Sequence, residues 1–197
     1  MKQSQCEKLG KLKIQANWYS NFDQLLELGD FSEAAPVIIA HEFFDALPIR
    51  TFKRIKEDVW HEIMISNTLN SGLQFEVSSQ PSFTQFSPLI RQVFQNRTGD
   101  ILEVSPETIR ICEKLASFLD NFKNAFVFIV DYAQKMDYKG SLRAIKNHKI
   151  LDDVFEEVGA CDLTADVDFS ALNSIFSNRL NTEVLYQGDF LLRNGIR

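Results

Sequence analysis

Hydrophobic residues along this chain alternate between short apolar runs and amphipathic stretches. Residues 37–40 (VIIA) and 125–130 (AFVFIV) are apolar at every position, and both runs are followed by acidic residues. Strands that are buried on both faces, as in a parallel sheet, have this pattern. We therefore expect both runs to form strands of a parallel sheet, with each strand buried on both faces.

Helical periodicity fills the stretches between these runs. Apolar positions 22, 25, 26 and 28 predict a helix with Ser20 as its N-cap and Gly29 at its end. Ser-Pro pairs at 87–88 and 105–106 predict two more helix starts, because serine caps a helix and proline suits its first residue. The apolar stripe expected on the second of these consists of Ile109, Cys112, Leu115, Ala116 and Leu119. Further helices are expected from about Asp168 and over 189–194.

Antiparallel strands are predicted between the two apolar runs. Residues 49–55 and 59–65 are rich in β-forming side chains and flank the polar turn 56–58, and positions 73, 75 and 77 alternate with polar residues. Shorter strands are expected at 101–104 and 184–187. Buried strands separated by helices, with antiparallel additions, indicate an α/β fold. We expect one domain over residues 1–197, with an antiparallel insertion at 49–79.

Composition narrows the function classes. Of the 197 residues, 45% are hydrophobic and 24% are charged, which is the balance of a globular protein. A net charge of −6 gives little support to nucleic-acid binding, which needs a basic surface. No apolar run approaches the roughly 18 residues that span a bilayer. The first 19 residues resemble neither a secretory signal nor a transit peptide.

Acidic residues follow both apolar runs. Glu42 and Asp45 follow the first run, and Asp131 follows the second. In open α/β sheets, ligands bind beyond the carboxyl ends of the strands, where carboxylates hold a cation, orient a basic substrate or accept nucleoside hydroxyls. The structural alternative is that Glu42 or Asp45 caps the following turn and that Asp131 pairs with a loop backbone. The spacing alone leaves both interpretations open.

The remaining reactive side chains form no recognised motif. The three histidines are too scattered for a metal site, and Cys6, Cys112 and Cys161 form no CxxC pair, so we expect reduced, buried thiols and no metal. No two of the eight glycines are separated by a single residue, so the sequence lacks G-x-G. A Rossmann-like cofactor site uses such a loop for close approach of the backbone. The chain by itself is therefore not expected to bind a nucleotide-like cofactor in the usual way.

Several ordered motifs resemble the MidA-like methyltransferases. Residues 39–48 (IAHEFFDALP) resemble the family's A-N-E-F-F-D-A-L-P signature. Further similarities are 102–107 (LEVSPE) to E-V-x-P, 130–132 (VDY) to a D-Y-G strand end, 141–148 to G-H-K, 160–169 (ACDLTADVDF) to A-D-L-T-A-x-V-D-F, and 187–192 to Q-G-x-F-L. These motifs extend over nearly the whole chain. Two positions depart from the family: His41 stands in place of an asparagine, and Ala133 in place of a glycine.

The resemblance implies a Rossmann-like class I methyltransferase sheet, with S-adenosyl-L-methionine as methyl donor and a protein arginine as acceptor. It also implies symmetric dimethylation of a core subunit of respiratory complex I, a role in complex I assembly, and the mitochondrial matrix as the compartment. Gln3 to Leu9 resembles the helix that follows the family's third strand. We therefore expect an internal portion of the methyltransferase, the C-terminal portion of the sheet, with an incomplete donor site and no activity of its own.

The family reaction gives the strand-end acids specific roles. Arginine stays protonated at neutral pH, so its nitrogens attack only when carboxylates draw the charge to one side. Glu42 and Asp45 are therefore the expected catalytic clamp for the guanidinium group. The resemblance places His41 and Asp131 on the cofactor side. The alternative is a non-catalytic interaction module of the same family, which binds a partner without transferring a methyl group.

Overall fold

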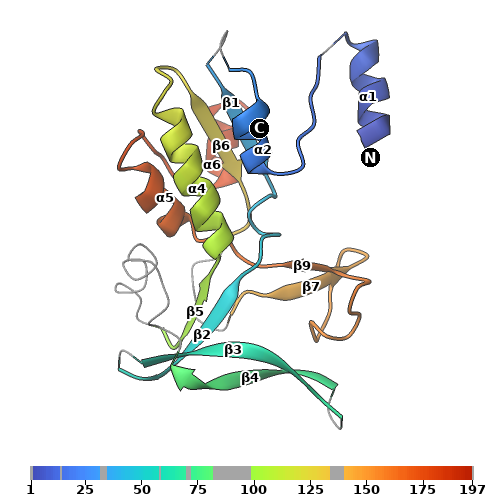
Figure 1. Ribbon diagram of the computed structural model, residues 1–197, viewed down its shortest axis with the longest axis vertical. Coiled ribbons are helices and arrows are strands. Elements are labelled where there is room, and N and C mark those ends of the chain that lie inside the picture. The colour runs from blue at the N-terminus through green and yellow to red at the C-terminus, as the bar shows by residue number, and fades with distance from the viewer. Residues whose placement is uncertain are drawn as a thin grey trace.

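The computed structural model describes residues 2–13, 15–31, 35–57, 59–69, 72–81, 99–133 and 140–196, which form a mixed α/β structure. The helices are α1 (Lys2–Lys11), α2 (Phe22–Leu28), α4 (Pro106–Leu119), α5 (Phe169–Phe176) and α6 (Gln187–Arg193). The strands are β1 (Val37–His41), β2 (Arg50–Lys56), β3 (Val59–Thr68), β4 (Gly72–Pro81), β5 (Ile101–Val104), β6 (Phe126–Val130), β7 (Arg143–Lys146), β8 (Lys149–Ile150) and β9 (Asp162–Thr164). They form three sheets of two, four and three strands. Figure 1 shows how these elements are arranged in space.

The two apolar runs form the predicted parallel pair. β1 and β6 lie side by side, with Val37 opposite Phe126 and His41 opposite Val130. Because the strands are parallel and in this register, their carboxyl ends finish at the same edge of the sheet. The residues that follow the two strands are therefore neighbours in space.

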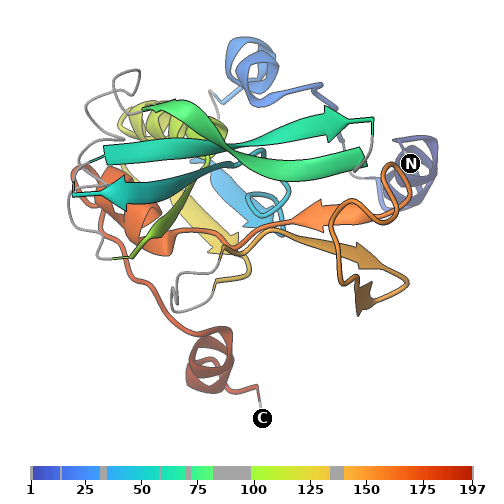
Figure 2. The ribbon, with the colours of Figure 1, turned by 90° about the horizontal axis from the view of Figure 1, so that it is seen from below.

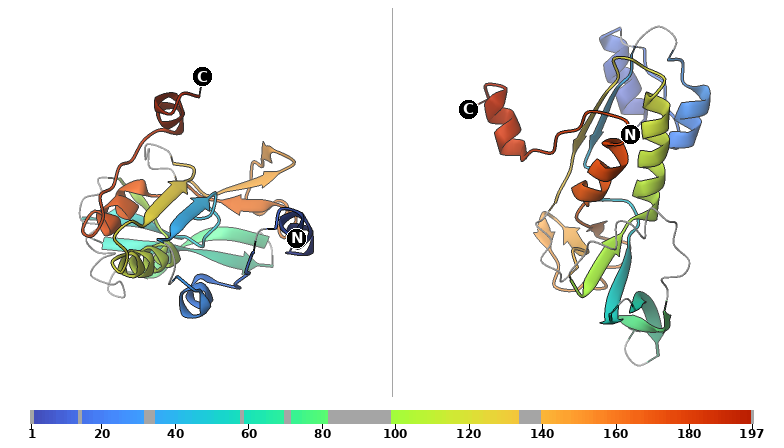
Figure 3. Two further views of the ribbon diagram at one scale, coloured as in Figure 1. Left: turned by 90° about the horizontal axis from the view of Figure 1, so that it is seen from above. Right: turned by 90° about the vertical axis from the view of Figure 1, so that its left-hand side faces the viewer.

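Helices α4 and α5 cover one face of this sheet, as the right-hand view of Figure 3 shows. The side chains that β1 and β6 turn toward the core are Ile38, Ala40, Val127 and Ile129. They pack against the buried stripe of α4, whose apolar positions follow the helical period.

The opposite face of the β1–β6 sheet is open, so the prediction of burial on both faces is wrong for the described residues. Val37 and Ile39 are 68% and 69% exposed, and Phe126 is 56% exposed. Helix α6 lies on this side and contacts the sheet through Phe190, whose ring centre is 5.0 Å from that of Phe128. This contact leaves most of the apolar face uncovered among the described residues.

The predicted hairpin and third antiparallel strand are confirmed. The four-stranded sheet has the order β4-β3-β2-β5, and every pairing in it is antiparallel. β5 joins it by pairing with β2, so that Leu102 lies opposite the fully buried Phe52. Figure 2 shows this sheet from below, crossing the end of the molecule away from α6. It anchors the amino-terminal end of α4, which follows β5 directly.

Local capping signals define the helix ends. Ser105 is the N-cap of α4, with its side chain accepting from Thr108 N at 3.2 Å, and Pro106 is the first helical residue, as predicted. The helix expected from about Asp168 is α5, and Asp168 is its N-cap. The cap of α2 is Asn21 rather than Ser20, because Asn21 Oδ1 accepts from Gln24 N. The expected stripe of α4 is buried.

Some predictions differ from the structure. Residues 184–187 form no strand, because no strand among the described residues pairs with them. Cys112 is buried as expected, but Cys6 is exposed. The three-stranded sheet of order β8-β7-β9 had no clear sequence signal. The helix predicted at 87–88 lies outside the described residues. None of the helices in the described ranges is long and apolar enough to cross a membrane.

Candidate active site

The turn after β1 gives Glu42 an unusual backbone. Its φ angle is +47°, in the left-handed region that glycine favours, and its N–H donates to Val130 O at 2.9 Å. A residue with a side chain in this region costs roughly 1–2 kcal/mol. Strained non-glycine residues of this kind concentrate at functional sites. The strained backbone therefore makes Glu42 a candidate functional residue, and its side chain is half exposed at the carboxyl end of β1.

Asp131 organises the loop that follows Glu42. Its Oδ2 accepts from the backbone N–H groups of Phe43, Phe44 and Asp45 at 3.2, 2.9 and 3.3 Å. Its Oδ1 accepts from Tyr132 N at 2.8 Å. Burial raises the pKa of the Asp131 carboxyl, against the lowering effect of the N–H donors of Tyr132 and Phe44. Both oxygens of Asp131 are therefore engaged in holding the loop, which is the structural alternative considered for this residue.

Asp45 is tied to the segment that follows β9. Its Oδ2 accepts from Thr164 Oγ1 at 2.7 Å, and its backbone O accepts from Ala165 N at 3.0 Å. Thr164 and Ala165 are buried. The two contacts fix both the backbone and one carboxylate oxygen of Asp45. Its second oxygen, Oδ1, has no hydrogen-bond donor among the described residues.

The segment after β9 is itself held by a polar network behind the site. Ser141 donates through N and Oγ to the Glu103 carboxylate, and Asp166 N donates to Ser141 Oγ at 2.8 Å. Arg143 Nη1 forms an ion pair with Asp166 Oδ1 at 2.6 Å, with both side chains largely buried. Glu103 of the E-V-x-P element thus supports the segment that contacts Asp45, rather than facing a ligand.

Tyr132 joins the two strand ends. Its hydroxyl donates to Glu42 Oε1 at 3.0 Å, and its backbone O accepts from Val167 N at 2.8 Å. The hydrogen bond with Glu42 raises the pKa of the Tyr132 phenol. His41 Nε2 lies 4.0 Å from the same Glu42 oxygen, with its side chain 60% exposed.

The resulting electrostatics favour a cation. Glu42, Asp45 and Asp131 lie around one loop. Burial, with a smaller effect of the Asp45 charge, raises the pKa of Asp131, and the hydrogen bond and charge of Glu42 raise the pKa of Tyr132. Within the described part of the chain, no lysine or arginine pairs with Glu42 or Asp45, whose hydrogen-bond donors are neutral hydroxyls. A planar guanidinium, with five N–H donors, suits carboxylates arranged in this way.

A binding site for the methyl donor has less support from these residues than a site for a cation. Both oxygens of Asp131 accept backbone N–H groups, three at Oδ2 and one at Oδ1, so most of its acceptor capacity is used within the loop. The sequence has no G-x-G loop, and His41 is the only residue predicted on that side whose side chain is open to solvent. The described residues do not by themselves fit S-adenosyl-L-methionine.

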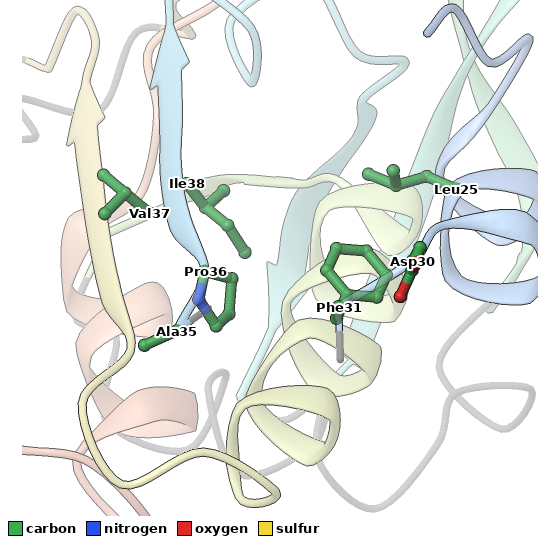
Figure 4. Close-up of a pocket in the computed structure, with 7 residues that line it drawn as sticks. All are labelled: Leu25, Asp30, Phe31, Ala35, Pro36, Val37 and Ile38. Carbon is green, nitrogen blue, oxygen red and sulfur yellow. The ribbon is translucent and has the colours of Figure 1, made fainter. Parts of the chain in front are cut away.

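A pocket elsewhere in the molecule contains none of these residues. It lies at the amino-terminal end of β1, away from Glu42, and has a volume of about 490 Å³. Figure 4 shows Ala35 to Ile38 on one side and the α2 region on the other. Its lining is mainly apolar, with Leu25, Asp30 and Phe31 contributed by α2 and the segment after it. It has no titratable cluster that would suit the chemistry of the strand ends.

The structure brings together His41, Glu42, Asp45 and Asp131, the four residues that the sequence selected. The sequence did not predict the hydrogen-bond donors of Glu42 and Asp45, which are the Tyr132 hydroxyl and the Thr164 hydroxyl, respectively. Both lie in motifs that resemble the family, at 130–132 and 160–169, and this is the one sequence signal that could have drawn attention to them.

Comparison with known proteins places this geometry in a family. Residues 1–186 match the family described as "Putative S-adenosyl-L-methionine-dependent methyltransferase". "Protein arginine methyltransferase NDUFAF7, mitochondrial" of Danio rerio is 36% identical over 165 residues, which are 83% of this chain and 36% of that protein. The Homo sapiens protein of the same name is 30% identical over 189 residues, which are 94% of this chain and 40% of that protein. The chain thus spans about two fifths of the length of these curated relatives.

Solved structures share the fold. A protein of uncharacterised function from Burkholderia thailandensis is similar over 99% of this chain and 52% of its own, with a TM-score of 0.72 at 19% identity. A second protein from that organism, crystallised with S-adenosyl-homocysteine, is similar over 96% of this chain and 56% of its own, with a TM-score of 0.64 at 19% identity. The Rossmann-like methyltransferase fold expected from the motifs is confirmed. The chain belongs to this family of S-adenosyl-L-methionine-dependent methyltransferases.

Proposed function

We propose that the protein acts in the methylation of protein arginine, with Glu42 and Asp45 binding the acceptor guanidinium. One observation carries this proposal. Two exposed or partly exposed carboxylates at the same sheet edge are each held by a neutral hydroxyl, and neither is paired with a lysine or arginine among the described residues. A carboxylate pair that is fixed but not neutralised is suited to a positively charged planar group.

The chemistry follows from the charge of arginine. Its guanidinium stays protonated, so its nitrogens are poor nucleophiles. Hydrogen bonds from the guanidinium N–H groups to Glu42 and Asp45 would concentrate the positive charge near the carboxylates and leave the remaining nitrogen richer in electrons. The same bonds would orient that nitrogen, which is a further source of rate enhancement. In the family, S-adenosyl-L-methionine supplies the methyl group.

Finer features of the proposal rest on the relatives and on the motifs. The curated relatives are named as mitochondrial protein arginine methyltransferases, which supports a protein substrate and a mitochondrial site of action. Symmetric dimethylation, a complex I core subunit as substrate and a role in complex I assembly are proposed from the family resemblance. His41 is proposed on the donor side, and Asp131 as the residue that holds the loop beneath both sides.

Calorimetry with a short arginine peptide tests the acceptor site. We expect the wild-type chain to bind the peptide and to bind its arginine-to-lysine counterpart more weakly. Glu42→Gln and Asp45→Asn keep the shape of each side chain and remove the charge. Each should weaken binding about ten- to a hundredfold, since a hydrogen bond between charged groups contributes about 1.5–3 kcal/mol. Equal affinities for wild type and both variants would contradict the proposal.

The alternative, a non-catalytic interaction module, is favoured by the missing G-x-G and by the occupied oxygens of Asp131. A titration with S-adenosyl-L-methionine separates the two functions. Micromolar binding by the chain itself would support an enzyme with a complete donor site. Arginine-peptide binding without donor binding would support the interaction module.

A further inference from the structure

We propose that Tyr132 is the positioning residue that fixes the Glu42 carboxylate for an incoming guanidinium. This inference rests on the proposed function and deepens it, since it concerns how the acceptor site is prepared before a substrate arrives. Tyr132 lies at the carboxyl end of β6, and Glu42 lies at the carboxyl end of the neighbouring β1.

The backbone of Tyr132 is held on both sides of its Cα atom. Its N–H donates to Asp131 Oδ1 at 2.8 Å, and its carbonyl O accepts from Val167 N at 2.8 Å. Its side chain is 53% exposed, so apolar packing is not the main constraint on the ring. The fixed backbone places the phenol where its hydroxyl reaches Glu42 Oε1 at 3.0 Å.

The contact acts on a carboxylate whose backbone is already constrained. Glu42 has a φ angle of +47°, and its N–H is bonded to Val130 O. What remains free is rotation within the side chain, and the Tyr132 hydroxyl restricts it by engaging Oε1. Glu42 Oε2 is then left for an N–H group of a ligand, in an orientation set before binding. Such preorganisation lowers the entropic cost of association.

The chemistry of the phenol suits this role better than that of a cation would. A lysine or arginine at this position would neutralise Glu42 and compete with the substrate guanidinium, whereas a phenol donates one hydrogen bond and leaves the negative charge. Among the described residues, the titratable groups that act on Tyr132 are Glu42 and Asp45 from the β1 end and Asp131 from the end of β6, and His41 lies beside Glu42. The acidic ones raise the pKa of Tyr132, so it remains a donor at neutral and mildly alkaline pH.

The contact itself is tested without any ligand, by following tyrosinate absorbance against pH. The difference between wild type and Tyr132→Phe isolates this residue from the other three tyrosines. We expect its pKa to lie above about 10, the ordinary value for tyrosine. In a Glu42→Gln background it should fall toward that value. An unchanged pKa in the Glu42→Gln background would show that the hydroxyl does not bind Glu42 and would overturn the inference.

Arginine-peptide calorimetry tests the consequence. Tyr132→Phe keeps the ring and should weaken binding about three- to tenfold, because the Glu42 side chain must then be ordered by the peptide itself. Tyr186→Phe, at another exposed tyrosine, is the matched control and should bind as the wild type does. The pH profile of wild-type binding should change as Tyr132 ionises at alkaline pH, because a phenolate no longer donates a hydrogen bond to Glu42, and Tyr132→Phe should lack this change.

The outcomes separate the two proposals. If wild type and Tyr132→Phe bind the arginine peptide equally and share one pH profile, the positioning role is wrong and the acceptor site stands. If the wild type binds no arginine peptide, the proposed function fails, and the positioning role fails with it.

Discussion

Glu42 has a side chain at a backbone position where glycine is favoured, and this has a measurable cost. Its φ angle of +47° is set by the turn between β1 and the loop that Asp131 holds. The strain is compatible with a role for the side chain, since a glycine would serve the turn alone. Substitutions of Glu42 can therefore be compared both in the free energy of unfolding and in peptide binding.

Two substitutions at Glu42 separate backbone strain from side-chain function. Both Glu42→Gly and Glu42→Ala remove the contact with Tyr132, but only glycine relieves the left-handed backbone. We expect Glu42→Gly to be more stable than Glu42→Ala by about 1 kcal/mol in urea unfolding. Neither variant should bind an arginine peptide as the wild type does. If alanine proved the more stable of the two, the turn would not have the left-handed geometry described.

Asp131 should matter to stability in a pH-dependent way. Asp131→Asn replaces one acceptor oxygen with an NH2 group that faces backbone N–H donors, so we expect a loss of about 1–2 kcal/mol at neutral pH. Burial raises the folded-state pKa of Asp131, so its protonation favours the folded state and its contribution falls as pH rises through that pKa. In the Asp131→Asn variant the amide at this position does not titrate, so it makes no such pH-dependent contribution.

The gap in unfolding free energy between wild type and Asp131→Asn should therefore widen as pH falls from about 7 toward about 4, near the ordinary carboxyl pKa. Urea unfolding of both proteins at several pH values measures it. A gap that narrows over this range would mean that the hydrogen bonds to Asp131 outweigh the burial of its carboxyl.

Among the elements, α4 connects the sheets. It follows β5 directly, packs on the covered face of β1 and β6, and touches α5. Its amino-terminal end depends on the Ser105 cap, whose oxygen accepts from Thr108 N. Ser105→Ala should lower the free energy of unfolding by about 1 kcal/mol, and Ser105→Asp should retain most of the stability.

Ser117→Ala is the matched control on the exposed side of the same helix, and it should leave the stability unchanged or slightly higher, since alanine favours the helix. Urea midpoints of the three variants give the comparison. Equal losses for Ser105→Ala and Ser117→Ala would show that the cap contributes nothing specific.

The elements that the sequence predicted correctly are those whose signals are local. The apolar runs of β1 and β6, the Ser105-Pro106 helix start and the alternation in β4 depend on neighbouring residues. The prediction over 184–187 was wrong because a strand needs a hydrogen-bonding partner, which its own residues do not specify. The short strands of the β8-β7-β9 sheet mix polar and apolar residues, so their pairing depends on distant contacts.

The same distinction applies to the candidate site. The acids were found because each follows an apolar run, a feature that is visible in the sequence. The bond between Tyr132 and Glu42 joins residues 90 positions apart, and that between Thr164 and Asp45 joins residues 119 positions apart. Only the fold brings such partners together, so no spacing rule could have paired them.

Taken as a whole, the molecule exposes the apolar face formed by Val37, Ile39 and Phe126 on the β1–β6 sheet. Apolar surface of this kind promotes association. We expect the chain to self-associate at high concentration, more strongly as pH falls from about 7 toward about 5 and the net charge of −6 is reduced. Light scattering against concentration measures this.

Substitutions on that face provide the control. Val37→Thr with Ile39→Thr keeps β-branched side chains suited to a strand and should reduce association without lowering the melting temperature. The same exchange at the covered Ile38 should destabilise the fold instead, because Ile38 packs on the core. Association that is unchanged by the double substitution would place the contact on another surface.

The parallel pairing of β1 with β6 also has a kinetic consequence. The β2–β3–β4 meander connects residues that are near in the chain, whereas the bond from Phe44 N to Asp131 closes a loop of 87 positions. Closing long loops is slow because of its entropic cost, and distant pairings therefore form late during folding. Recovery of arginine-peptide binding after dilution from urea should accordingly lag behind the return of the meander's β signal, so that the acceptor site is among the last parts of the molecule to be completed.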